Sequence, residues 1–578
     1  MHRAAITILA LAALAAPLRS QNTPGDRAGG AAAILTADDV LAVLSKAATA
    51  LGNDTLAAAV VDRTGAILGV YARAAAAPQS SDIAVSVARA GAMFANDQAP
   101  LSSRTVRFIS GIHFPPGVRN TPNAALYGIE LTNRGCAVDP AGSAFFSQPI
   151  GRTTSIAGAF GDEAGGAPLP CEPSDTRGCA RGGPMLDDHG EPLSSVGITT
   201  GKVDVFDTGQ DRLGAVPVNP GGIPIYRGGK VIGGVGVTGV SPALAEYAAT
   251  LAAAGAGRGI DFSGPLGAPG AVFIDGLRLP FFGACTDIPC IRAALNTTPA
   301  GASPGRFSDG RLTVLPRAGQ QAPEGYLAGP RSAQGSDGLT ADDVRQIIEQ
   351  SVAVSLRTRA QIRLPIGQPV RMIMAVSDAE GRILAAYRMA DATLFSLDVA
   401  MTKARNAYYF SSRDGYNVLK HYVDTNPYDR YTWDPAPPAG QGWAMTARTL
   451  SFAGQPLFPP GIDLDTTPTP GPWFDLFNYD AVNPCTEGPG PTRGGNRAYF
   501  NQSGIVWFPG SVPLYKNGRL VGGLGVSGDG VEQDDYVSQL GSEGFHPPDA
   551  LRVDHSVIHT SRGDVRLPYL KFPRHPEF

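Results

Sequence analysis

Apolar and polar positions alternate along the first half of the chain in a way that predicts helices and hairpins in a fixed order. Apolar residues at helical spacing over residues 40–48 predict a helix, and two short apolar runs joined by a polar turn over residues 57–71 predict a β-hairpin. Asp82 can serve as the N-cap of a second helix. A second hairpin over residues 224–239 and a helix over residues 243–253 follow. This order predicts an α+β domain with an antiparallel sheet flanked by helices.

The second half of the chain repeats this order. Its last hairpin has Asn517 and Gly518 at the turn, a pair typical of two-residue hairpin loops. Asp398 can serve as the N-cap of its middle helix. The predicted elements are a helix over residues 344–352, a hairpin over residues 372–387, a helix over residues 398–409, a hairpin over residues 513–526 and a helix over residues 532–540.

Blocks of matching sequence accompany the repeated pattern. The letters Leu-Thr-Ala-Asp-Asp-Val occur at residues 35–40 and again at residues 339–344, and later blocks match in the same order. The chain therefore contains two copies of one domain, which we call the first repeat (residues 35–290) and the second repeat (residues 339–578). A Gly/Pro/Ser-rich stretch at residues 291–338 is expected to be a linker, and the first repeat has a long Gly/Pro-rich insertion at residues 120–222.

Length and composition agree with two domains and exclude some partners. A chain of 578 residues is too long for a single core, and its 72 Gly and 49 Pro indicate many turns and long loops. The formal net charge of -4 gives no electrostatic reason to bind nucleic acid or an anionic membrane.

The N-terminus has the pattern of an export signal. Arg3 precedes a stretch at residues 4–16 that is apolar except for Thr7, and Pro17 ends it. The stretch has the length of a signal-peptide core and is too short to span a bilayer. Residues 1–20 are therefore expected to be a signal peptide, and the mature protein is expected to be periplasmic or secreted.

Export makes the six cysteines candidates for disulfide bonds. Cys285 and Cys290 bracket a short loop, as do Cys171 and Cys179, while Cys136 and Cys485 occupy comparable places in the two repeats. Six cysteines allow fifteen pairings, and the sequence does not choose among them. Because Cys-x-x-Cys-His does not occur, covalent attachment of c-type haem is excluded.

Motifs in the second repeat resemble the GlcG/HbpS-like haem-binding protein family. They are Asp-Val-Ala-Met-Thr-Lys-Ala-Arg at residues 398–405, Gly-Ile-Val at 504–506, Pro-Leu-Tyr at 513–515, Gly-Gly-Leu-Gly-Val-Ser-Gly at 522–528 and Gln-Asp-Asp at 533–535. The resemblance implies two tandem profilin-like domains, frequent oligomerisation, and association with haem or another tetrapyrrole. The first repeat departs from the pattern, with Val87 in the place of Lys403, so we expect the ligand in the second repeat.

Four residues of the middle helix and the hairpin before it are candidates for binding the ligand. Lys403 and Arg405 could neutralise the carboxylates of haem, Tyr387 could form part of the wall, and Asp398 lies at the start of the same helix. The alternative for the two cations is a solvated helix face or an ion pair with Asp378.

The last hairpin and helix supply further candidates. The turn that begins at Ser527 could present backbone N–H groups to an anion, whereas the glycines before it fit a strand that a helix approaches closely. Asp534 and Asp535 could stabilise the helix N-terminus, or one of them could bind a metal ion or act as an acid/base group.

Histidines are the remaining candidates. His421 precedes a loop rich in Tyr and Trp and could be an axial ligand of haem, although a surface histidine is the alternative. His546, His555 and His559 lie near one another in the sequence and could form a metal patch.

Together these features predict an exported protein that binds haem or another tetrapyrrole non-covalently. The two repeats are expected to pack as an internal pseudo-dimer, and homo-oligomerisation is a further expectation. Two alternatives stay open: an enzyme acting on a small carboxylic or hydroxy acid with Asp534 or Asp535 as its acid/base group, and a ligand-free scaffold for a partner protein. His-Glu-x-x-His does not occur, which weakens the case for a hydrolase.

Overall fold

The computed structural model describes residues 33–111, 126–133, 198, 218–264, 272–274, 276–314, 318–460, 469–482 and 504–578. The predicted signal peptide and nearly all of the predicted insertion at residues 120–222 lie outside these ranges, as do Cys136, Cys171, Cys179 and Cys485. In the described part, Cys285 and Cys290 form a disulfide bond.

The first repeat forms the helices and hairpins that its sequence predicts. Thr36 caps the first helix through a capping box with Asp39. The helices are α1 (Ala37–Ala50), α2 (Pro78–Phe94), α3 (Ser103–Gly111), α5 (Pro242–Gly255) and α6 (Ile288–Leu295), with a 3₁₀ turn at Ile129–Leu131. The strands are β1 (Ala57–Asp62), β2 (Ile67–Arg73), β3 (Gly222–Arg227), β4 (Lys230–Thr238), β5 (Ile260–Asp261), β6 (Phe273–Ile274) and β7 (Leu277–Arg278).

The second repeat forms the same series and adds elements to it. Its helices are α7 (Ala341–Ser355), α8 (Phe395–Ser411), α9 (Arg413–Asp424), α10 (Ala447–Ala453), α11 (Phe474–Val482) and α13 (Val531–Gly541), with 3₁₀ turns at Asp549–Leu551 and Val553–His555. Its strands are β10 (Ile373–Asp378), β11 (Ile383–Arg388), β12 (Thr432–Asp434), β13 (Ser511–Lys516), β14 (Arg519–Ser527), β15 (Val557–Thr560) and β16 (Gly563–Arg566).

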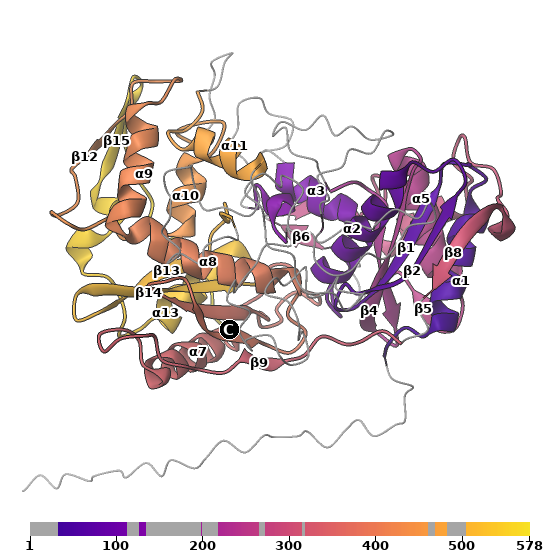
Figure 1. Cartoon of the computed structure of the whole chain (residues 1–578), viewed down its shortest axis with the longest axis horizontal. Coiled ribbons are helices and arrows are strands. Elements are labelled where there is room, and N and C mark those ends of the chain that lie inside the picture. Colours follow the sequence, from indigo (N-terminus) through magenta and orange to yellow (C-terminus); the bar gives the residue numbers. More distant parts are fainter. Residues whose placement is uncertain are drawn as a thin grey trace, which may run out of the picture. The chain divides into compact units, whose positions relative to one another are not determined.

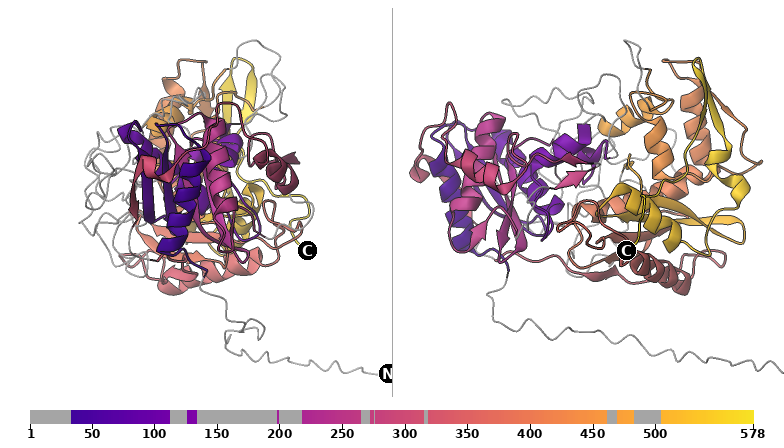
Figure 2. Two further views of the ribbon diagram at one scale, coloured as in Figure 1. Left: turned by 90° about the vertical axis from the view of Figure 1, so that its right-hand side faces the viewer. Right: turned by 180° about the vertical axis from the view of Figure 1, so that it is seen from behind.

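The main sheets of the two repeats share one strand order. The first sheet runs β5-β3-β4-β1-β2-β8 and the second β13-β14-β10-β11-β9, where β8 is Gly310–Val314 and β9 is Gly325–Ala328, with antiparallel neighbours throughout. Helix α2 packs on β1, β3 and β4, and α8 packs on β10, β13 and β14, while α1 packs against α5 and α7 against α13. Figure 1 and the view from behind in Figure 2 show each sheet with its helices. The predicted antiparallel α+β architecture is therefore observed.

Glycines let the long helix of each repeat lie close against its sheet. A Cβ added at Gly236 would lie 2.0 Å from the carbonyl oxygen of Ala84, and one added at Gly525 would lie 2.0 Å from that of Ala400. The prediction that the glycine run is a strand approached closely by a helix is confirmed.

Two sequence predictions about helix ends are wrong. Helix α2 begins at Pro78 after Ala77, and α8 begins at Phe395 after Leu394. Asp82 and Asp398 therefore lie inside their helices and are buried, so neither is the N-cap. The sequence pattern misplaced both starts because each helix begins with residues that are apolar or lack a strong capping signal.

The stretch expected to be a linker supplies an edge strand to each sheet. A 3₁₀ turn at Phe307–Asp309 leads into β8 (Gly310–Val314), which pairs with β2. Strand β9 (Gly325–Ala328) pairs with β11. Gly/Pro/Ser-rich composition did not reveal these strands because each is short and pairs on only one side.

Side chains from the two repeats meet at one interface. The rings of Phe94 and Phe395 stack with centroids 4.2 Å apart, and the N–H of Leu394 donates to the carbonyl of Met93 at 2.9 Å. The guanidinium of Arg363 bonds both Asp391 of the second repeat and Gln98 of the first. Within the described residues, no helix has the length and apolar character required to cross a membrane.

Candidate functional site

A buried ion pair joins α8 to α13 in the second repeat. Lys403 Nζ lies 3.0 Å from Asp534 Oδ2, and it also donates to the carbonyl oxygen of Val526 at 2.9 Å. The Phe508 ring lies beneath the ammonium, 4.8 Å from it. Because Gly525 admits the backbone of α8, Lys403 reaches past Val526, near the end of β14, to α13 without contacting solvent.

A second ion pair lies beside the first. Arg448, on α10, donates through Nε to Asp535 Oδ2, and the backbone N–H of Lys571 donates to the same oxygen at 3.1 Å. Asp535 is fully buried, and the C-terminal segment that contains Lys571 covers it. The two pairs together place two cations and two carboxylates side by side in the core, and we call Lys403, Arg448, Asp534 and Asp535 the polar cluster.

Only one of these pairs has a counterpart in the first repeat. Arg104 binds Glu246, whose positions correspond to Arg448 and Asp535, with Nη2 2.6 Å from Oε2. Val87 and Ala245 occupy the positions of Lys403 and Asp534. The side chain of Val87 lies against Gly236 as Lys403 lies against Gly525, which confirms the correspondence. The fold therefore forms without the Lys403–Asp534 pair.

Burial shifts the ionisation of the cluster toward its neutral forms. Burial raises the pKa of Asp534 to about 7, against the opposing effect of Lys403. Burial lowers the pKa of Lys403, which Asp534 opposes, and raises the pKa of Asp535, which Arg448 opposes. Asp534 is therefore poised to gain or lose a proton near neutral pH.

Several predicted residues lie in or next to the cluster, and others do not. Ser527 follows Val526 on β14 and donates to the hydroxyl of Ser396 at 3.1 Å. Arg405 is fully buried and donates to the carbonyl oxygen of Gly381 at 2.7 Å, as Arg89 does to Gly65 at 2.9 Å. Because this contact occurs in both repeats, we infer that it stabilises the fold.

The solvated-face alternative for Lys403 and Arg405 is wrong, since both side chains are buried. Asp534 lies in the first turn of α13, as expected of a carboxylate that stabilises a helix N-terminus, and Asp534 and Asp535 each also bind a cation from another helix. Tyr387 packs edge-on against Tyr326, with centroids 4.9 Å apart. His421 is exposed on α9 beside Tyr422.

An open pocket lies next to the polar cluster on the same helix. Asp535 and Gln539 are one turn apart on α13, and Gln539 lines a cavity of about 320 Å³. The C-terminal segment contributes Tyr569, Leu570 and Phe572 to the lining. His546 and Arg552 also line the pocket and contribute an imidazole and a guanidinium.

Hydrogen bonds fix the polar side chains of this pocket. His546 Nε2 lies 2.8 Å from the carbonyl oxygen of Gln539. Arg552 binds Asp554 at 2.6 Å and Asp549 at 3.4 Å, and it stacks over the ring of Tyr569 at 4.9 Å. His546, His555 and His559 do not converge on a metal: within the described residues no group of three such ligands was found, and His555 and His559 each pair with a different aspartate.

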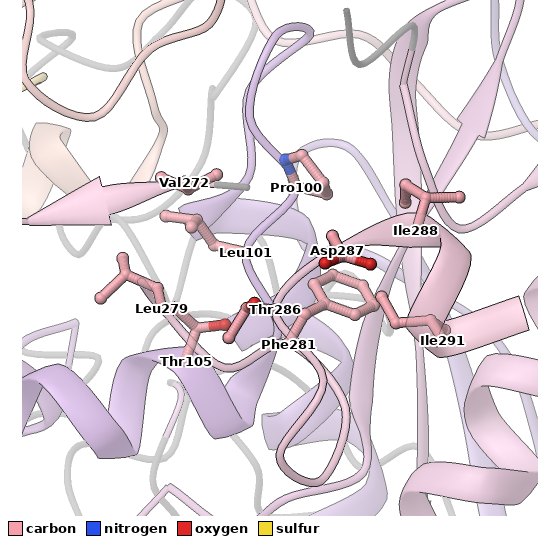
Figure 3. Close-up of a pocket in the computed structure, with 10 residues that line it drawn as sticks. All are labelled: Pro100, Leu101, Thr105, Val272, Leu279, Phe281, Thr286, Asp287, Ile288 and Ile291. Atoms are coloured by element: carbon pink, nitrogen blue, oxygen red, sulfur yellow. The ribbon is translucent and has the colours of Figure 1, made fainter. Parts of the chain in front are cut away.

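The first repeat has a much smaller cavity beside its corresponding segment. Leu101, Thr105, Leu279 and Phe281 are among the side chains around it in Figure 3. Its volume of about 10 Å³ leaves room for no more than one water molecule. A small molecule therefore fits the pocket of the second repeat and not this one.

The sequence did not single out Arg448 or Phe508, and it offered His546 only as part of a metal patch. Arg448 had a signal, because Arg-Thr recurs at residues 104–105 and 448–449 and so does an acidic residue at positions 246 and 535. Phe508 and the pocket role of His546 had none, since neither residue belongs to a block that recurs between the repeats.

Comparison with known proteins relates part of the second repeat to one family. Residues 475–543 match the model of a family described as haem degrading protein HbpS-like. The matched span includes β13, β14 and α13, and thus Ser527, Asp534 and Asp535. No curated protein matches the chain.

Three solved structures show a weak likeness. A PduOC:heme complex is 20% identical, covers 36% of this chain and 95% of its own, and has a TM-score of 0.20. Klebsiella pneumoniae protein ORFY is 17% identical over 36% of this chain and 92% of its own, with a TM-score of 0.19. A double mutant of Streptomyces reticuli HbpS is 16% identical over 38% of this chain and 97% of its own, also with a TM-score of 0.19. Likeness at these scores supports no argument about this chain.

Proposed function

We propose that the second repeat binds haem or a related tetrapyrrole non-covalently. The observation that carries the proposal is the pocket beside α13, which combines an imidazole, a guanidinium and aromatic rings. Helix α13 also lies within the span that matches the HbpS-like family model. Pockets of small-molecule sites commonly measure about 300–1,000 Å³, so this cavity is at the lower end, and a macrocycle would leave an edge in solvent.

His546 has the chemistry required of an axial ligand. A neutral imidazole that donates Nε2–H to the Gln539 carbonyl keeps the lone pair of its Nδ1 for a metal. A backbone acceptor of this kind also fixes the ring orientation. His421, the ligand expected from the sequence, is the second candidate, but it does not line the pocket.

The rest of the lining suits the periphery of a macrocycle. Tyr569 and Phe572 offer rings and Leu570 an aliphatic side chain for contact with an apolar face. Arg552 is shared between Asp549 and Asp554, so a ligand carboxylate would replace Asp549, which makes the longer contact. Bound haem would supply an iron centre, and the protein residues would orient it and exclude water from one face.

We further propose that the mature protein is exported and that its two repeats form an internal pseudo-dimer. The apolar segment at residues 4–16 supports export, as does the Cys285–Cys290 disulfide, a bond typical of oxidising compartments. Stacking of Phe94 on Phe395 supports the pseudo-dimer.

Spectroscopy of ligand variants tests the proposed function. The ferric haem complex of the His546→Ala variant should lose the absorption and electron paramagnetic resonance signature of histidine ligation, whereas His421→Ala should keep it. Loss of that signature in His421→Ala alone would transfer the ligand to α9. An unchanged signature in both variants would show that neither histidine binds the haem iron and would contradict binding in this pocket.

A further inference from the structure

The polar cluster contains buried polar atoms that the fold does not satisfy. Among the described residues, Asp534 Oδ1, Asp535 Oδ1 and Arg448 Nη2 are buried and have no hydrogen-bond partner. Asp534 is 2% exposed and Asp535 is fully buried. Buried polar groups are almost always paired, so these three atoms on neighbouring side chains retain hydrogen-bonding capacity for a further polar group.

The first repeat shows that the architecture can satisfy this region completely. Both oxygens of Glu246 are bonded, Oε1 and Oε2 by Arg104 and Oε2 also by the N–H of Gly283 at 3.3 Å. Val87 and Ala245 fill the remaining space with apolar groups. The same fold can therefore form with every hydrogen bond of this acidic side chain made. The unpaired atoms of the polar cluster in the second repeat thus point to a role beyond folding.

The charge of the cluster defines what can complete it. With Lys403 and Arg448 protonated and both aspartates ionised, the cluster is neutral, and it offers one unused guanidinium donor beside two unused carboxylate acceptors. An anion would bond Arg448 but would be repelled by the carboxylates. Protonation of one carboxylate removes that repulsion and creates a second donor.

We propose that the polar cluster binds a small monocarboxylate together with one proton. The ligand carboxylate accepts from Arg448 Nη2 and from the protonated carboxyl of Asp534, while Lys403 keeps its contact with Asp534. No covalent step is involved. The inference goes beyond haem binding and does not depend on it, since none of the four residues of the cluster lines the pocket.

The charged groups facing Asp534 make it the proton carrier. They are Lys403 from α8, Asp535 from α13, Asp529 from the loop before α13, and, next to these carboxylates, Arg448 from α10 and Arg363. Asp535 and Asp529 are each bonded directly to an arginine and to a backbone N–H, whereas among the described residues Asp534 accepts a side-chain bond from Lys403 alone.

The pocket gives the route to the cluster. Tyr569, Leu570 and Phe572 line the pocket, and the N–H of Lys571, in the same segment, donates to Asp535. Displacement of residues 569–572 would open the polar cluster to the pocket. A small carboxylate enters by this route, whereas a larger one is stopped at the pocket.

Calorimetric titration of the mature protein with sodium acetate and sodium propionate tests the proposal. Runs from about pH 6 to about pH 8, in two buffers with different ionisation heats, measure both the affinity and the protons taken up. We expect saturable binding, uptake approaching one proton above pH 7, and a loss of affinity of about tenfold per pH unit there.

Two variants make the result decisive. Asp534→Asn imitates the protonated carboxyl in shape and hydrogen bonding, so it should still bind the carboxylate but without pH dependence or proton uptake. The Lys403→Val/Asp534→Ala variant reproduces the apolar pair of the first repeat and should stay folded without binding either probe. Failure of both probes to saturate the native protein, or an unchanged pH dependence in Asp534→Asn, would overturn the proposal, and neither result would alter the haem experiment.

Discussion

Lys403 and Asp534 form an ion pair 3.0 Å long that is buried from solvent, in a place where the other half of the same chain has Val87 and Ala245. The protein therefore contains its own control for this pair. The neighbouring pair is present in both repeats, as Arg104–Glu246 in the first and as Arg448–Asp535 in the second. We therefore attribute it to the fold. The Lys403–Asp534 pair distinguishes the repeat in which we place function.

Removing one partner of this pair should destabilise the protein strongly, whereas replacing both partners by apolar residues should destabilise it little. In the Lys403→Val variant, Asp534 loses its counter-charge in the core, and we expect a loss of roughly 3–5 kcal/mol in the free energy of unfolding near pH 8. The Lys403→Val/Asp534→Ala variant should recover most of that loss, because buried ion pairs are often replaced by apolar residues at little cost. Urea unfolding measures both values. A double variant less stable than the single one would show that the second repeat needs the pair to fold.

Stability should fall with rising pH because of Asp534. Its pKa is raised from 3.8 to about 7 in the folded protein, so the folded state retains a proton that the unfolded state has lost between about pH 4 and pH 7. The stabilisation from this group is complete below pH 4 and is lost as the pH rises to about 7, with a slope of at most about 1.4 kcal/mol per pH unit. Urea unfolding at several pH values should show a steeper fall in the native protein than in Asp534→Asn, because Asp378, whose pKa burial raises to about 6, contributes to both curves. Parallel curves would mean that Asp534 has an ordinary pKa.

Gly510 should be intolerant of a side chain for two reasons that can be separated. Its φ of +119° disfavours other residues, and an added Cβ would lie 2.5 Å from the Val526 carbonyl oxygen and 2.6 Å from Lys403 Nζ. Gly221 in the first repeat has a φ of +125° and a similar clash with Val237 but no lysine nearby. Gly510→Ala and Gly221→Ala should each lose about 1–3 kcal/mol of stability from backbone strain. Only Gly510→Ala should alter the pH dependence of unfolding, and equal pH profiles would argue against contact with Lys403.

Arg363 should be essential for joining the repeats. Its side chain is 1% exposed, with Nε 2.7 Å from Asp529 and Nη1 2.8 Å from Gln98. Arg363→Met leaves Asp529 buried without its cation, and we expect a loss of roughly 3–5 kcal/mol. Arg519→Met is a matched control, because the Arg519–Asp337 pair is exposed and should contribute little to stability. Thermal unfolding compares the two variants, and similar midpoints would contradict the role of Arg363.

The sequence predicted the elements better than the site. Apolar periodicity and the Asn517–Gly518 turn located the helices and hairpins, because both signals are local. Lys403, Asp534 and Asp535 were found as candidates, yet their pairing was not, because Lys403 and Asp534 lie on different helices and meet only when α8 and α13 both pack against β14. The strands at residues 310–314 and 325–328 escaped prediction because their sheets supply the hydrogen bonds that stabilise them.

The helix starts at Pro78 and Phe395 were missed for a related reason. Asp82 and Asp398 have the residue type of an N-cap, but tertiary burial draws the preceding residues into the helix. His546 was a candidate only as part of a metal patch, and its place in the pocket was not predicted because that place depends on a contact with the Gln539 carbonyl at the end of α13.

Titration of the mature protein with haemin, followed through the Soret band, tests the central claim most directly. We expect a saturable one-to-one transition with a defined band. The affinity for haemin should be about 10–100-fold lower in His546→Ala than in His421→Ala. A broad response that does not saturate, and that is the same in His546→Ala, would contradict haem binding by the second repeat.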